Sequence, residues 1–129
     1  MISFNNISKY YANHCALHNI HLEIPKGKMA FLTGHSGAGK TTLLKLIMRI
    51  EKASQGQILV DNKNLSKFTR KTIPKLRQEI GMVFQNPRLL LNRTIFDNIA
   101  LPLVIIGYST ADINKRVRAA LEKVDLRNK

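Results

Sequence analysis

Apolar and polar residues alternate in two stretches of the chain, and this alternation predicts strands that bury one face. The first stretch, 2–7, indicates a short strand, and 16–24 predicts a longer, half-exposed antiparallel strand. A third short strand is indicated at 58–60. The polar residues 61–64 that follow it have the composition of a hairpin turn.

Two other stretches, 29–32 and 80–84, are apolar without interruption. Strands that are buried on both faces of a parallel sheet have uninterrupted apolar sequences of this kind, because helices cover both faces of the sheet. The segment 25–28, Pro-Lys-Gly-Lys, predicts a turn before the first run. Both runs are therefore expected to be strands of a buried parallel sheet.

Helical periodicity accounts for three further segments. The segment 40–50 is apolar almost all round, which predicts a buried helix. A second helix is expected over 94–100, with Thr94 as its cap and Asp97 in its first turn. The segment 110–124 is amphipathic. Its expected buried stripe consists of Ile113, Val117, Ala120, Leu121 and Val124.

Composition narrows the class of protein. A chain of 129 residues with 44% hydrophobic residues suits one globular domain and is too apolar for a disordered chain. Its longest apolar stretch, 99–106, is interrupted by Pro102 and is too short to span a bilayer. The sequence after Met1 has no leader pattern, and the single Cys15 suits a reducing cytoplasm. The net charge of +13 favours an anionic partner.

One motif indicates chemistry. Residues 34–41, Gly-His-Ser-Gly-Ala-Gly-Lys-Thr, fit the phosphate-binding Walker A pattern between an expected strand and an expected helix. Its glycines let backbone N–H groups approach phosphate oxygens at the positive end of the helix. Lys40 is expected to reach the β- and γ-phosphates, Thr41 to bind Mg²⁺, and Thr42 to donate to the α-phosphate. The predicted phosphate-binding residues are Gly34, His35, Ser36, Gly37, Ala38, Gly39, Lys40, Thr41 and Thr42. A glycine-rich turn without a ligand is the alternative interpretation.

The match extends beyond this motif. The strings FNNISKYY…ALHNIHLEIPKG, MAFLTGHSGAGKTTLLKLIMRIE and IGMVFQNPRLLLNRTIFDNIALPLVIIG resemble ATP-binding subunits of the ABC transporter superfamily, in particular its cell-division branch. The resemblance implies an α/β P-loop NTPase fold of ABC type. This fold has three layers, a mostly parallel core sheet and an N-terminal antiparallel β subdomain, here incomplete at the C-terminus. Residues 1–84 would form the β subdomain and Walker A core, and 85–129 the Q-loop and the start of a helical subdomain.

The resemblance also assigns roles to single residues, with ATP and Mg²⁺ as the cofactors. Tyr11 lies where the family stacks an aromatic ring on adenine, although Tyr10 is adjacent and either ring could simply pack on the sheet. Gln85 lies at the Q-loop, where it would help to position Mg²⁺ and the attacking water. Thr41 and Gln85 are thus the expected metal ligands. His14, His18 and His21 show no pattern of metal ligands and are expected to be surface or strand residues.

Motifs that the family uses for hydrolysis are not in the sequence. Neither Ser-Gly-Gly nor Asp-Glu occurs, so an LSGGQ-like signature and a Walker B motif are missing, as is the switch histidine. The family hydrolyses ATP with these groups. We therefore expect a partial sequence or a truncated product that is inactive alone, with its two parallel strands exposed at unpaired edges.

The expected partners follow from the resemblance. They are a second copy in a head-to-tail dimer and an FtsX-like integral membrane protein that docks on 86–103 at the cytoplasmic face of the inner membrane. The subunits of lipoprotein-release or macrolide-export transporters are the alternative. A non-catalytic basic fragment is another, because 63–77 is rich in Lys and Arg and free of acids. An anionic membrane surface would suit this segment, and nucleic acid is not expected because no recognition motif is present.

Overall fold

The structure, a computed structural model, describes residues 1–126 and divides into two units. The first unit is Met1–Gly81 and the second begins at Met82. Each unit has its own cluster of buried hydrophobic residues, so each is described by itself. The predicted functional boundary between 84 and 85 remains a prediction, and residues 127–129 of the predicted segment 85–129 lie outside the described residues.

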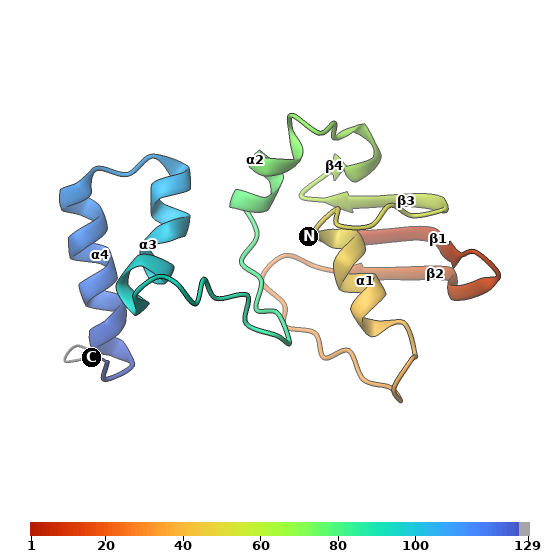
Figure 1. Ribbon diagram of the computed structural model, residues 1–129. Helices are drawn as coiled ribbons and strands as arrows, with labels where there is room; N and C mark the ends of the chain where they lie inside the picture. Colours follow the sequence, from red (N-terminus) through yellow and green to blue (C-terminus); the bar gives the residue numbers. More distant parts are fainter. Residues whose placement is uncertain (127–129) are drawn as a thin grey trace. The chain divides into compact units, whose positions relative to one another are not determined.

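The first unit contains a 4-stranded antiparallel sheet in the order β2-β1-β3-β4 (Figure 1). Its strands are β1 Ile2–Tyr11, β2 His14–Ile24, β3 Gln55–Val60 and β4 Lys63–Asn64. In the central strand, Phe4 pairs with Leu22 on one side and with Ile58 on the other. The three predicted segments are therefore strands, as predicted, and each is longer than the prediction because pairing extends β1 at its C-terminal end and β2 and β3 at their N-terminal ends.

The turn between β3 and β4 has the backbone that its sequence predicts. Asp61 and Asn62 both adopt positive φ angles, 45° and 62°. Asp and Asn tolerate this conformation better than other side chains, and two such residues suit a tight hairpin. The N-terminal ammonium of Met1 donates to the Asp61 carboxylate at 2.8 Å and lowers the pKa of that carboxyl group. The predicted hairpin turn is confirmed.

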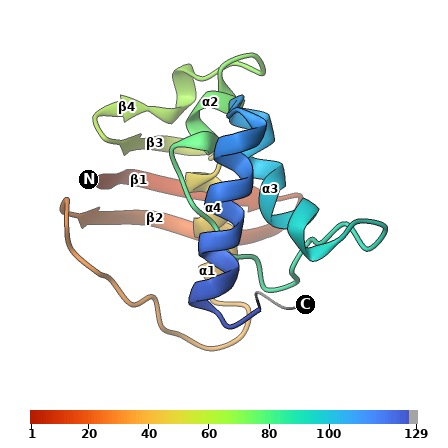
Figure 2. The same ribbon diagram turned by 90° about the vertical axis from the view of Figure 1, so that its left-hand side faces the viewer.

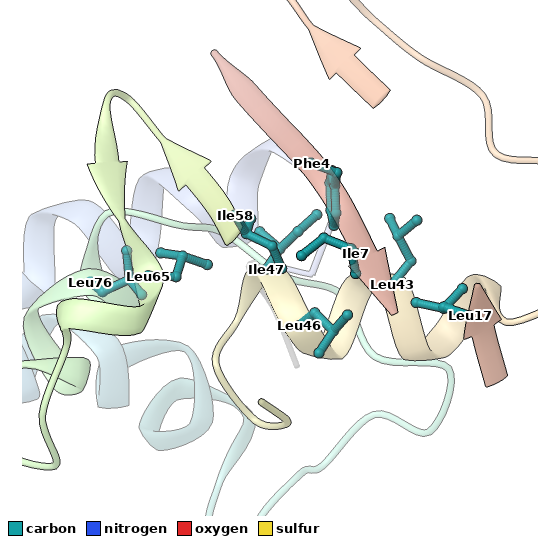
Figure 3. Packing of buried hydrophobic residues seen from close by; sticks show 9 residues of the cluster. All are labelled: Phe4, Ile7, Leu17, Leu43, Leu46, Ile47, Ile58, Leu65 and Leu76. Atoms are coloured by element: carbon teal, nitrogen blue, oxygen red, sulfur yellow. The ribbon is translucent and has the colours of Figure 1, made fainter. Parts of the chain in front are cut away.

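A helix, α1 Lys40–Ile47, packs against this sheet and closes the core of the first unit. Figure 3 shows side chains of β1, β3 and α1 gathered between the sheet and the helix. The buried cluster consists of Phe4, Ile7, Leu17, Leu43, Leu46, Ile47, Ile58, Leu65 and Leu76. The helix is shorter than the predicted 40–50, and Leu44 and Ile50 are exposed. The prediction of a helix buried almost all round is therefore wrong on that side.

The two expected parallel strands are not strands in the described residues. The segments 29–32 and 80–84 form neither helix nor strand. Phe31 is 86% exposed and Val83 is 97% exposed, which is the opposite of the predicted burial. A β-strand is held by hydrogen bonds to its neighbours, and within residues 1–126 no segment pairs with either run. The apolar sequence alone could not supply those partners.

Two short helices between the hairpin and Gly81 were not predicted. They are the 3₁₀ helix η1 Leu65–Lys67 and α2 Ile73–Gln78. Arg49 and Arg77 attach them to the end of α1. The Arg49 guanidinium donates to the carbonyl oxygens of Leu65 and Phe68, and that of Arg77 donates to those of Met48 and Arg49. Charged side chains therefore supply contacts that an apolar pattern does not reveal.

The second unit consists of two helices, α3 Ile95–Ile106 and α4 Thr110–Lys123, that lie side by side (Figures 1 and 2). Thr94 caps α3 in a capping box with Asp97, as predicted, and α3 continues through Pro102 beyond the predicted end. Val117 and Leu121 of α4 are buried against α3 residues. Ala120 and Val124, which were predicted on the same stripe, are exposed.

None of the helices in the described residues is long and apolar enough to cross a membrane.

Candidate functional site

The loop that precedes α1 ends at a glycine that no other residue could replace without strain. Gly39 has a φ angle of +86° and stands immediately before the first residue of α1. A Cβ atom at this position would lie 2.6 Å from the carbonyl oxygen of Ala16 and 2.7 Å from the Leu17 side chain. The loop is thus pressed directly onto β2, in a conformation that L side chains rarely adopt. This contact fixes where the N-terminus of α1 lies against the sheet.

Backbone N–H groups of this loop are available for an anion. Within the described residues, the N–H of Ala38 is the one in 34–39 that donates to a backbone carbonyl, that of His35, at 3.3 Å. The first turn of α1 contains no acidic residue, and no side chain caps it. Residues 33–38 are exposed. Free N–H groups at the positive end of a helix form a site for phosphate.

The Lys40 ammonium lies over the same loop. Its Nζ donates to the carbonyl oxygens of Gly34 at 2.7 Å and of His35 at 2.6 Å. These bonds hold the charge beside the free N–H groups, where a phosphate oxygen could replace either carbonyl as the acceptor. Within residues 1–126 no carboxylate is hydrogen-bonded to Lys40, so no fixed negative charge competes with an incoming anion.

Tyr11 lies at the end of β1 and is brought to the same part of the first unit. Gly39 contacts Leu17, Leu17 pairs with Lys9 across the β1–β2 ladder, and Tyr11 follows Lys9 by two residues. Tyr11 is 37% exposed, so its ring is accessible to a flat ligand. The neighbouring Tyr10 is 40% exposed, and accessibility does not distinguish the two rings.

Magnesium is compatible with the residues at the start of α1. Thr41 is exposed in the first turn and offers a hard oxygen ligand. No group of three or more His, Cys, Asp or Glu residues in the described part of the chain could hold a metal ion alone. Mg²⁺ commonly takes few protein ligands and completes its shell with phosphate oxygens and water. A single hydroxyl beside a phosphate loop therefore fits this ion.

The other predicted residues lie apart from this loop in the sequence. Gln85 is exposed and belongs to the second unit. Close to it in the sequence, the Arg88 guanidinium lies 4.9 Å from the centre of the Phe84 ring. Its role in binding Mg²⁺ remains a prediction. The histidines of β2, at positions 14, 18 and 21, are exposed as expected.

Sequence reasoning did not identify Lys9 and Glu51. The Lys9 Nζ lies 3.1 Å from Glu51 Oε2 and 4.6 Å from the centre of the Tyr11 ring. Lys9 and Tyr11 are two residues apart on one strand and therefore lie on the same face. This spacing could have indicated the contact between the Lys9 ammonium and the Tyr11 ring. The contact with Glu51 joins residues far apart in the chain and had no local signal.

Comparisons with known proteins show the family to which the chain belongs. Residues 17–129 match the family model described as ABC transporter. The chain is 50% identical to the cell division ATP-binding protein FtsE of Haemophilus influenzae over 100% of its own length and 60% of that protein. It is 44% identical to the methionine import ATP-binding protein MetN of Clostridioides difficile, of which it covers 40%.

Among solved structures, a dimeric post-hydrolysis state of the ATP-binding cassette MJ0796 bound to ADP and Pi superimposes with a TM-score of 0.87. The identity is 30%, over 95% of this chain and 56% of that one. The likeness confirms the predicted fold class. The chain spans about 60% of the length of the cell-division relatives it matches.

Proposed function

The chain belongs to the ABC transporter family, and from this premise we propose that it forms the ATP-binding part of an FtsE-type cell-division complex. The observation that carries the proposal is the loop at the start of α1. There Gly39 is pressed onto β2, the N–H groups are free and Lys40 lies over the loop carbonyls. Similarity to FtsE over the whole chain supports the cell-division assignment.

We propose that each part of the site has a separate task. The N–H groups of 34–39 and the N-terminus of α1 bind the phosphates, and Lys40 neutralises their charge. The ring of Tyr11 stacks on the adenine. Thr41 would hold Mg²⁺, which would supply positive charge to the phosphates. Hydrolysis is proposed for the family's complete catalytic machinery, which also uses the motifs that this sequence lacks.

The proposed partners are a second ATP-binding subunit and an FtsX-like integral membrane protein at the cytoplasmic face of the inner membrane. The docking surface would include 86–103. Its apolar side chains Leu89, Leu90, Leu91 and Leu101 are exposed. Asn98 fixes the loop before α3, because its side chain accepts from the Leu90 N–H at 2.8 Å and donates to the carbonyl of Thr94 at 2.9 Å. A fastened apolar loop is a suitable surface for a protein partner.

Isolation of the protein from its own membranes tests the partner. The tagged wild type, captured from detergent-solubilised membranes, should retain an FtsX-like protein identified by mass spectrometry. Leu90→Asp should lose it, because a charge would be buried at the interface. Lys28→Asp, an exposed change outside the segment, should not. Retention of a lipoprotein-release or macrolide-export permease instead would support the transport alternative.

An anionic membrane surface is a second proposed partner, and the basic segment 63–77 supports it. Lys63 is paired with Glu79 at 2.8 Å, and Arg77 is used within the fold. The exposed cationic side chains of this segment that form no ion pair within the described residues are Lys67, Arg70, Lys71 and Lys75. Cations of this kind attract acidic lipids by about 1 kcal/mol each near a membrane surface.

Vesicle sedimentation tests this second partner. The protein should bind phosphatidylcholine vesicles that contain phosphatidylglycerol, should not bind pure phosphatidylcholine vesicles, and should be released by salt. The triple variant Lys67→Gln, Lys71→Gln and Lys75→Gln should bind less. The control is the triple variant Lys26→Gln, Lys28→Gln and Lys52→Gln, which removes the same charge outside the segment. Equal losses of vesicle binding in the two triple variants would show that binding depends on net charge and not on this segment.

A further inference from the structure

A chain of contacts links the segment after α1 to the aromatic ring at the end of β1. The Lys9 ammonium lies 3.1 Å from Glu51 Oε2 and 4.6 Å from the centre of the Tyr11 ring. The Lys9 side chain is only 12% exposed and that of Glu51 is 30% exposed. The pair is therefore shielded from water more than an ordinary surface ion pair, and its geometry is better fixed.

The backbone around this pair is fastened as well. The N–H of Ser54 donates to the carbonyl of Ser8 at 2.9 Å, and the N–H of Tyr10 donates to the Ser54 hydroxyl at 3.1 Å. These bonds attach the segment that follows α1 to the end of β1. Glu51 is thus held at a defined position beside Lys9.

Strand geometry explains why Lys9 reaches the ring. Lys9 and Tyr11 are two residues apart on β1, so their side chains point to the same side of the strand. The ammonium lies over one face of the aromatic ring, where the π-electron density attracts a cation. A cation on one face leaves the opposite face for a flat ligand, and it restricts rotation of the ring about its side-chain bonds.

We propose that Lys9 is a positioning residue, which Glu51 holds in place, and that it fixes the Tyr11 ring for stacking on a nucleobase. The inference rests on the proposed function, because it presumes that the first unit binds a nucleotide. It also selects Tyr11 rather than Tyr10 as the stacking ring, since Tyr11 is the one held by the ammonium. The recognised group is a planar base attached to a polyphosphate.

Two ligands separate this role from general effects on the fold. ATP contacts both the loop and the ring, whereas inorganic tripolyphosphate lacks a base and contacts the loop alone. Affinities of the purified protein for each, with Mg²⁺ present, are measured by titration calorimetry for the wild type and for Lys9→Gln, Lys9→Arg, Glu51→Gln and Tyr11→Ala. Lys28→Gln is the matched control, because Lys28 is exposed and its side chain forms no hydrogen bond, ion pair or ring contact in the described residues.

The proposal predicts a split between the ligands. Lys9→Gln and Glu51→Gln should weaken ATP binding about threefold, as expected for loss of a cation–π contact, and leave tripolyphosphate binding unchanged. Lys9→Arg should restore ATP affinity, because guanidinium also binds an aromatic face. Lys9→Gln in the Tyr11→Ala background should cause no further loss, since the ring on which Lys9 acts is gone.

Other outcomes overturn the inference in distinguishable ways. Equal weakening of both ligands would mean that Lys9 supports the fold or the phosphate loop and not the ring. Unchanged ATP affinity in both Lys9→Gln and Glu51→Gln would remove the positioning role while the proposed function stands. A wild-type protein that binds neither ligand would contradict the proposed function, and this inference with it. If Lys9→Gln does not fold, as judged by its circular dichroism, Glu51→Gln decides the question.

Discussion

Gly39 is the residue of the phosphate loop whose lack of a Cβ atom matters most to the fold. Gly39→Ala would place a Cβ 2.6 Å from the Ala16 carbonyl oxygen in a left-handed conformation. We expect the free energy of unfolding to fall by about 3 kcal/mol, of which the conformation alone accounts for about 1–2 kcal/mol. Urea unfolding without nucleotide measures the change.

Gly27→Ala is the control for that experiment. Gly27 also has a left-handed φ angle, +76°, but a Cβ there would meet nothing within 4 Å. Its cost should therefore be the conformational part alone, about 1–2 kcal/mol. Equal losses in the two variants would show that the contact between the loop and β2 does not constrain the fold.

Residues of the phosphate loop could be predicted because their chemistry depends on spacing within eight consecutive positions. Gly39, Lys40 and Thr41 lie at the start of a helix, as the motif requires. Lys9 and Glu51 could not be predicted, because an ion pair between a strand and a distant loop leaves no periodic signal. The same holds for the carbonyl contacts of Arg49 and Arg77.

At the scale of elements, α3 depends on its N-terminal cap. The Thr94 hydroxyl accepts from the Asp97 N–H at 3.0 Å, and the Asp97 carboxylate accepts from the Thr94 N–H at 3.3 Å. Thr94→Ala should lower the free energy of unfolding of the second unit by about 1 kcal/mol and accelerate amide exchange at the start of α3. Thr94→Ser keeps the hydroxyl and should behave as wild type. A similar effect of both substitutions would contradict the capping role.

Elements whose signals lie within their own sequences were predicted correctly, whereas the two predicted parallel strands are not formed in the described residues. The caps and the periodicity of α3 and α4 lie within their own sequences, as do the alternation and turn of the antiparallel hairpins. The segments 29–32 and 80–84 are apolar enough for buried strands, but a parallel strand needs neighbours that are distant in the chain. The short α2 was missed because its six residues include Pro74 and two cations and show no clear apolar stripe.

At the scale of the whole molecule, the unpaired apolar segments are expected to be open to solvent. In the 129-residue chain, amides of 29–32 and 81–84 should exchange with deuterium much faster than those of β1, because no backbone hydrogen bond protects them in the described residues. The Ile80 N–H is set apart from these, since it donates to the Arg77 carbonyl at 3.3 Å. Hydrogen-exchange mass spectrometry at two protein concentrations measures this. Strong protection at both concentrations would contradict the unpaired state of these segments, and protection at high concentration alone would indicate self-association.

The central claim is that the loop 34–39 and the start of α1 bind the phosphates of ATP, and calorimetric titration of the purified protein with MgATP tests it most directly. The account predicts saturable binding by the wild type, weakening of about tenfold or more in Lys40→Ala through loss of charge-assisted hydrogen bonds, and unchanged binding in Lys28→Ala. No binding by the folded wild type, or equal affinity of Lys40→Ala and wild type, would contradict it.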